Sequence, residues 1–123
     1  MLKNLFLVAI GGASGSVLRY FVHWIVSKKS ISNFPYQTFI VNIIGCLLIG
    51  ILVGYLAKNS SQNETLKLLL ITGFCGGFTT FSAFGLENIN MIQNQNYQLA
   101  FIYTSLSLVL GVLAVSLGIF ISK

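Results

Sequence analysis

The sequence predicts an all-α membrane protein with four transmembrane helices. Of its 123 residues 55% are hydrophobic and only 7% are charged, and the apolar residues fall into four long stretches. Soluble domains carry roughly 25% charged residues, so this chain cannot cover itself with a surface that water solvates. A spanning helix needs about 20 mostly apolar residues. Four of them use most of the chain, and we therefore expect a single four-helix transmembrane domain over residues 1–123.

The first predicted helix covers residues 3–27 and the second covers residues 36–57. Residues 28–35 form a polar connection, and Pro35 suits the first turn of the helix that follows. The N-terminal stretch could also be read as a cleavable signal peptide. Its apolar pattern resumes at Val17, however, and is longer than the apolar core of a signal. We therefore interpret it as a full span.

The third predicted helix covers residues 65–91 and the fourth covers residues 97–121. Polar connections at residues 58–64 and 93–96 separate the helices. Four spans place both ends of the chain on the same side of the membrane.

The third helix contains a segment that forms helix poorly. The adjacent glycines Gly76 and Gly77 are followed by the β-branched pair Thr79 and Thr80, and both residue types have low helix propensity. We expect the helix to be broken at its centre, the alternative being a continuous helix whose small residues allow close packing. Broken backbone at membrane depth must be satisfied by protein or by a water-filled cavity. Carbonyls freed in this way commonly bind a cation.

Small residues four positions apart recur in three of the helices. The pairs are Gly11 and Gly15, Gly50 and Gly54, and Gly73 and Gly77. This spacing lets helix backbones approach closely in lipid, so we expect a tightly packed bundle.

The seven Lys and Arg against two Asp and Glu give a formal charge of +5. In a membrane protein this excess sets topology, so we expect no nucleic-acid partner. Lys3, Lys58, Lys67 and Lys123 fall on one side of the membrane, and Lys28 and Lys29 fall on the other. So small a difference in lysine number between the two sides specifies the orientation of the chain in the membrane only weakly. In addition, four short helices enclose too little space for a polar path. The sequence therefore predicts an oligomer, for which an antiparallel homodimer of dual topology is a candidate.

Arg19 and His23 lie inside the first helix, four residues apart on one face. A charge at mid-membrane costs about 2.5 to 3.5 kcal/mol on insertion scales, so both need an explanation. Arg19 either extends to the interface beside an aromatic belt of Tyr20, His23 and Trp24, or supplies a fixed positive charge that attracts anions to a wet vestibule. For His23 alone, interfacial packing is the simpler interpretation.

Asn42 lies about two turns into the second helix, and its amide offers donors and an acceptor. It either bonds to another helix or faces a polar path. On the fourth helix Tyr103, Ser107 and Gly111 share a face. The two hydroxyls either bond back to their own helix or form a track of donors. Cys46 and Cys75 are widely spaced in apolar stretches and fit packing rather than a metal or redox motif.

Three phenylalanines, Phe78, Phe81 and Phe84, recur every three residues and form one stripe. Such a stripe usually faces lipid or core. Here it is interleaved with the hydroxyls of Thr79, Thr80 and Ser82, next to the expected break. Because the edge of an aromatic ring is electropositive, inward-turned rings together with Asn42 and hydroxyl donors could hold a small anion without a full charge. We count Ser82 with Phe81 and Phe84 as candidates for this path.

Together these patterns resemble the Fluc (CrcB) family of fluoride channels over essentially the whole chain. Four motifs carry the resemblance: GGASGSVLRY at residues 11–20, TFIVNIIG at residues 38–45, GFCGGFTTFSAF at residues 73–84, and Tyr103 with Ser107. The third motif is highly specific. The resemblance implies a dual-topology antiparallel homodimer in the inner (plasma) membrane, with two pores that export fluoride passively from the cytoplasm and reduce its toxicity.

The resemblance also implies roles for individual residues of the pore. Phe81 and Phe84 would line it with their ring edges toward the ion, and Asn42 would donate to fluoride at the vestibule. Tyr103 and Ser107 would begin a hydroxyl track on the fourth helix.

By the same resemblance, the backbone carbonyls of Gly76 and Thr79, doubled by the dimer, would hold a central structural sodium ion. Arg19 matches the family's arginine. There are two departures from the family pattern. Ala83 stands where the family usually has Thr, and Gly111 stands where a further serine is often found, so the expected hydroxyl ligands are fewer.

The mechanism we expect is replacement of hydration, in which several close donors take the place of the water that fluoride sheds. A small proton-coupled multidrug exporter is the alternative function, but it needs a membrane-embedded carboxylate. Glu87, late in the third helix, is the one candidate, and its position near a span end suits solvation. A non-transporting packing partner would leave the break unexplained. No set of acid, base and nucleophile converges, so we do not expect an enzyme.

Overall fold

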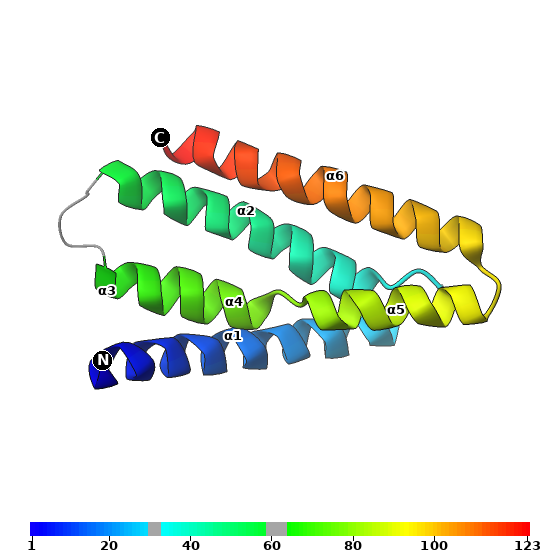
Figure 1. The fold of residues 1–123 in the computed structure, drawn as a ribbon, viewed down its shortest axis with the longest axis horizontal. Coiled ribbons are helices and arrows are strands. Elements are labelled where there is room, and N and C mark those ends of the chain that lie inside the picture. The colour runs from blue at the N-terminus through cyan, green and yellow to red at the C-terminus, as the bar shows by residue number, and fades with distance from the viewer. Residues whose placement is uncertain (30–32, 59–63) are drawn as a thin grey trace.

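The computed structural model describes residues 1–29, 33–58 and 64–123, and all regular structure within them is helical. The elements are α1 (Leu2–Lys29), α2 (Tyr36–Lys58), α3 (Glu64–Leu66), the π-helix η1 (Lys67–Cys75), α4 (Gly76–Phe78), α5 (Phe81–Gln93) and α6 (Tyr97–Ser122) (Figure 1). The connections expected at residues 28–35 and 58–64 lie partly outside the described residues.

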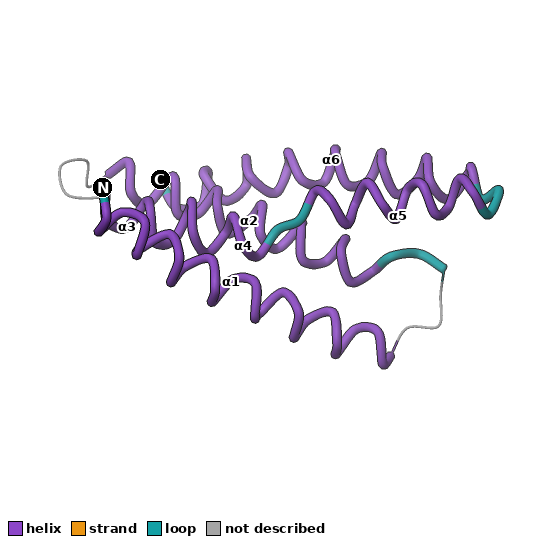
Figure 2. The backbone as a smooth tube through the Cα atoms, turned by 60° about the horizontal axis from the view of Figure 1, so that its bottom comes forward, coloured by secondary structure: helices purple, strands orange, loops and turns teal. Residues whose placement is uncertain are grey.

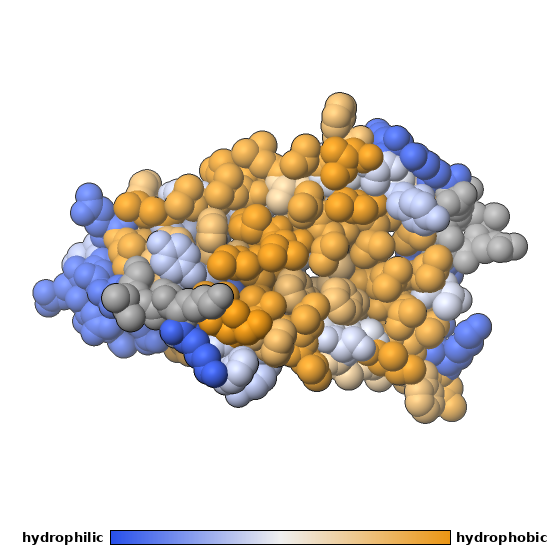
Figure 3. All heavy atoms as spheres, turned by 180° about the vertical axis from the view of Figure 1, so that it is seen from behind, coloured by the Kyte–Doolittle hydropathy of each residue, from blue (hydrophilic) through white to orange (hydrophobic). Residues whose placement is uncertain are grey.

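Four helical stretches in the described part of the chain are long and apolar enough to span a membrane. They are Leu2–Lys28, Tyr36–Lys58, Glu64–Gln93 and Tyr97–Ser122, which confirms the four predicted spans. Both termini lie at the same end of the bundle (Figure 1), as expected. On the face that Figure 3 shows, hydrophobic residues cover the middle and hydrophilic ones gather at the two ends, as a bilayer requires.

The third span is broken, as predicted, and the structure places the break at its threonines. Gly76 and Gly77 are helical within α4. Thr79 is extended, with φ −83° and ψ 158°, and so is Thr80, with φ −147° and ψ 121°. The sequence did not predict the π-helical form of the preceding segment, η1, in which each hydrogen bond spans five residues.

Close backbone contacts at glycines hold the helices in two pairs, α1 against η1 and α4, and α2 against α6. A Cβ atom added at Gly15 would overlap the backbone carbonyl of Phe74. One added at Gly50 would overlap the carbonyl of Val115. The tight packing predicted from small residues is thus confirmed on both pairs.

The remaining end of the bundle, around α5, is packed with aromatic side chains. Tyr103 is fully buried there with Met91 and Ala100, and half-buried aromatics of α2, α5 and the α1–α2 connection surround them. Toward this end α1 diverges from the other helices (Figure 2). The third span therefore has one half packed on α1 and another half packed on α2 and α6.

Candidate functional site

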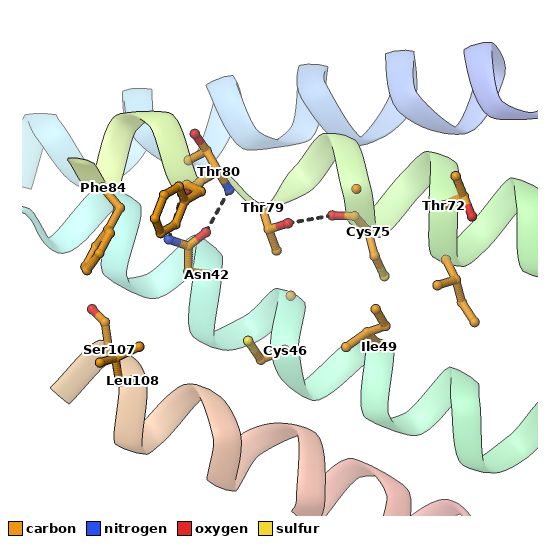
Figure 4. A pocket seen from close by; sticks show the side chains of 14 residues that line it. Asn42, Cys46, Ile49, Thr72, Cys75, Thr79, Thr80, Phe84, Ser107 and Leu108 are labelled. Atoms are coloured by element: carbon orange, nitrogen blue, oxygen red, sulfur yellow. Dashed lines mark hydrogen bonds between the residues drawn. The ribbon is translucent and has the colours of Figure 1, made fainter. Parts of the chain in front are cut away.

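An open pocket of about 510 Å³ lies at the break, between the third span, α2 and α6 (Figure 4). Six of the residues predicted from the sequence line this pocket: Asn42, Gly76, Thr79, Phe81, Phe84 and Ser107. Its lining also includes Cys46, Thr72, Cys75 and Thr80. The lining is mostly apolar, with a few polar groups, which is typical of a small-ligand site. Arg19, Ser82 and Tyr103 do not line this pocket.

Asn42 bonds to both backbone groups of the residue at the break. Its Nδ2 donates to Thr80 O at 3.0 Å, and its Oδ1 accepts from Thr80 N at 2.8 Å. The side chain of α2 thereby gives a partner to Thr80 N, which lies outside the helix, and adds a donor to Thr80 O, the carbonyl of the N-cap residue of α5. An amide nitrogen carries two hydrogens, and Thr80 O is the one acceptor of Nδ2 among the described residues, so the second N–H is available to a ligand in the pocket.

These contacts release two carbonyls from helical bonding. In an unbroken helix Thr80 N would donate to Gly76 O, but it donates to Asn42 instead. Likewise Ala83 N donates to Thr80 Oγ1 at 3.2 Å rather than to Thr79 O. Gly76 and Thr79 both line the pocket, and unwound carbonyls of this kind suit an alkali cation.

The hydroxyls at the break stay close to the backbone. Thr79 Oγ1 donates to Cys75 O at 2.9 Å, and Thr80 Oγ1 caps α5. Ser82 Oγ lies 3.3 Å from Thr80 Oγ1, and Ser82 does not line the pocket. Ser82 thus supports the cap in this arrangement.

The two pore-candidate rings lie side by side at the start of α5. The ring centroids of Phe81 and Phe84 are 5.7 Å apart with an interplanar angle of 37°. Phe81 is 82% exposed, whereas Phe84 also packs against Tyr103 at 5.1 Å. Within one chain the ring of Phe84 is therefore packed against a buried side chain, whereas the ring of Phe81 is largely exposed.

Ser107 brings a hydroxyl from α6 to the pocket, opposite Asn42 (Figure 4). Its Oγ is buried and has no hydrogen-bond partner among the described residues. Leaving a buried hydroxyl unpaired costs about 1–3 kcal/mol, so this group is free to bind a ligand. Nε2 of His23 is also buried without a partner in the described part of the chain, but His23 lies outside the pocket.

A carboxylate that the sequence analysis assigned to solvent lies in a hydrogen-bond network. Glu87 Oε2 accepts from Thr38 Oγ1 at 2.6 Å, and Glu87 Oε1 accepts from Tyr103 OH at 2.8 Å. Thr38 and Tyr103 are both fully buried. Glu87 is half-buried and lines an open polar pocket at that end of the bundle, which fits its predicted place near a span end, but the sequence did not indicate that hydroxyls from two other helices bind its carboxylate.

The same network fixes the ring next to the pocket. Tyr103 donates its hydroxyl to Glu87 and places its ring against Phe84. Nearby, Thr104 Oγ1 donates to Asn88 Oδ1 at 2.9 Å, and Asn88 Nδ2 donates to Phe84 O at 3.0 Å. Sequence reasoning missed Asn88 and did not predict the partners of Glu87, although a polar residue inside a span is the signal that marks such groups.

The described residues contain no group of three His, Cys, Asp or Glu side chains that could hold a metal ion. Cys46 and Cys75 are free thiols on facing elements of the pocket.

Comparison with known proteins finds a matching family model and relatives that share one name. The family model described as CrcB-like protein, Camphor Resistance (CrcB), matches residues 6–119. A "Fluoride-specific ion channel FluC" of Flavobacterium psychrophilum is 49% identical over 99% of this chain and 98% of the relative. Proteins of the same name from Azobacteroides pseudotrichonymphae and Phocaeicola vulgatus are 47% and 42% identical, over 100% and 99% of this chain and 98% and 100% of their own lengths.

Proposed function

Because the chain belongs to the CrcB family, we propose that it is a fluoride-specific ion channel, a multi-pass protein of the plasma membrane. Relatives bearing that name match nearly its full length. The observation that carries the proposal is the pocket at the break, which joins Phe84, Ser107 and Asn42 without a charged side chain. A channel family implies passive flow, so fluoride leaves the cytoplasm down its gradient.

Selectivity follows from the chemistry of the pocket lining. Fluoride is small and holds its water strongly, so the path must offer donors at close range as the water leaves. The unpaired hydroxyl of Ser107 and the second N–H of Asn42 are such donors, and the ring edges of Phe81 and Phe84 add positive potential. None of these groups carries a full charge that would trap the ion.

We propose that two chains form an antiparallel homodimer, with each orientation present in the membrane. Two features support it. Phe81 lines the open pocket and is itself 82% exposed, so a second copy would add to the pocket wall there. In addition, the lysines at the two ends of the bundle differ by only four against two, counting Lys3, Lys58, Lys67 and Lys123 against Lys28 and Lys29.

The break supports a structural sodium ion as a further part of the proposal. Gly76 O and Thr79 O are released from helical bonding, and both residues line the pocket. Two copies of each carbonyl would hold the ion at the dimer centre. When bound, it would supply positive charge that neutralises the carbonyl dipoles of the two breaks.

The proton-coupled exporter finds no support. Such a transporter needs a carboxylate that exchanges protons with its substrate path. Glu87 is instead committed to Thr38 and Tyr103 and does not line the pocket at the break. The named relatives are fluoride channels, not exporters.

The test is ion release from liposomes that contain the purified protein. We expect rapid loss of fluoride and retention of chloride. Phe84→Ile removes a ring edge while keeping an apolar side chain, and it should slow fluoride release at least tenfold. Phe120→Ile is the matched control, because Phe120 is 78% exposed on α6 and lies outside the pocket. Equal release from both variants, or equal loss of chloride, would contradict the proposal.

A further inference from the structure

Arg19 reaches from α1 to the end of α4, where the third span breaks. Its Nε donates to Gly77 O at 3.0 Å, and the contact is partly buried. In an unbroken helix Gly77 O would accept from the N–H of Phe81. Extended backbone at Thr79 and Thr80 carries Phe81 away from that position, so Arg19 supplies the missing donor.

We propose that Arg19 is a positioning residue that holds the break through this hydrogen bond, and that its charge is secondary. The residue does not line the pocket, so it touches no ion there. Asn42 of α2 bonds to Thr80, while Arg19 of α1 bonds to Gly77 on the other side of the break. The two side chains thus fix the turn of backbone that leads into Phe81.

The hydrogen bond from Arg19 to Gly77 O matters because it lies within a membrane-spanning segment. A carbonyl without a partner at membrane depth is costly, because no water replaces the lost bond. The C-terminal end of a helix also carries partial negative charge, which suits a guanidinium donor. An arginine that serves only as an anion attractor would have no need to place its Nε on a backbone carbonyl.

Two variants of Arg19 separate the hydrogen bond from the charge. In Arg19→Gln the amide Nε2 stands the same number of bonds from the backbone as the arginine Nε, so the variant keeps a donor and loses the charge. Arg19→Lys keeps the charge but places a methylene at that position, with its ammonium one bond farther out. Arg19→Met lacks both. Lys28→Gln is the matched control, because Lys28 is a cation of α1 that lies over the Trp24 ring, away from the break.

The inference rests on the proposed function for its first readout, the ratio of fluoride to chloride release from liposomes. We expect Arg19→Gln to stay within about threefold of the natural protein, and Arg19→Lys and Arg19→Met to lose at least tenfold in this ratio. Lys28→Gln should change nothing. Retention by Arg19→Lys together with loss in Arg19→Gln would overturn the proposal and favour a vestibule charge. Uniform retention, or uniform loss, would overturn it as well.

The second readout does not depend on transport. Hydrogen exchange of residues 76–84 in the purified full chain reports directly on the break. It should speed up at least tenfold in Arg19→Met and Arg19→Lys and stay slow in Arg19→Gln. If the natural protein released no fluoride, the proposed function would fail, and this exchange pattern alone would still support the role of Arg19. Unchanged exchange in Arg19→Met would overturn that role.

Discussion

The two halves of the third span are held in place by different interactions. The half made of η1 and α4 lies on α1 at glycines, so that a Cβ at Gly15 would overlap Phe74 O. In the other half, α5, a Cβ added at Gly85 would meet no atom of another described element within 4 Å. That half is tied to its neighbours by hydrogen bonds instead, such as that from Tyr103 OH to Glu87.

The difference teaches where each half is sensitive. A contact between two backbones leaves no room for one carbon atom, whereas a hydrogen bond tolerates added volume but not the loss of a donor. The break separates the two kinds of packing. The pocket therefore lies between a rigid backbone contact and a polar network that positions Phe84.

The largest effect is expected where backbones meet. Gly15→Ala should destabilise the protein by about 2–3 kcal/mol, within the range for overpacked cores, because Phe74 O and Phe78 N lie where its methyl group would go. Gly85→Ala is the control in α5 and should be neutral or stabilising by up to about 1 kcal/mol through helix propensity. Thermal unfolding in detergent measures both, and equal stability of the two variants would break the comparison.

A smaller effect is expected from removing one donor in the polar half. Tyr103→Phe takes away the hydroxyl that Glu87 accepts while it keeps the ring against Phe84. We expect a loss of about 1.5–3 kcal/mol, typical of hydrogen bonds to charged groups. Tyr97→Phe, at a residue of α6 that is 62% exposed, is the control. The same unfolding assay decides, and equal midpoints would show that the network contributes nothing.

The smallest effect is expected at Gly111, the position at which the resemblance to the family led us to expect a serine. A Cβ there would lie 3.5 Å from Cys46 Sγ, an ordinary contact, so Gly111→Ser should change stability by less than about 0.5 kcal/mol. At Gly118 an added Cβ would lie 2.5 Å from Leu47 O, so Gly118→Ser should unfold at a clearly lower temperature. Similar midpoints for both serine variants would show that α2 and α6 have room to separate.

Length and hydropathy were enough to predict the four spans, and the break followed from residues 76–80. The exact site of the break did not, because helix propensity ranks Gly as the worse former, whereas tertiary bonds decide the outcome. Asn42 offers Thr80 an alternative partner, whereas the N–H of Gly76 bonds to Gly73 O and Ile71 O of its own helix. The π-helical form of η1 has no signal comparable with hydrophobic periodicity, so the sequence could not indicate it.

The candidate site was predictable in its members more than in their contacts. A polar residue inside a span must be satisfied or functional, which identified Asn42, Arg19 and Ser107. The same rule does not name the partner. The carbonyl of Gly77 accepts from Arg19 across 58 positions, and Glu87 meets Tyr103 from another helix, so both pairings emerge only from the packing of the bundle.

The central claim is that a pocket of uncharged donors at the break conducts fluoride and rejects larger halides. The most direct test is the reversal potential of reconstituted protein in a planar bilayer, with fluoride on one side and an equal concentration of chloride on the other. The account predicts a reversal potential displaced strongly toward the value at which fluoride alone is at equilibrium. A reversal potential near zero, which means equal permeability to both ions, would contradict it.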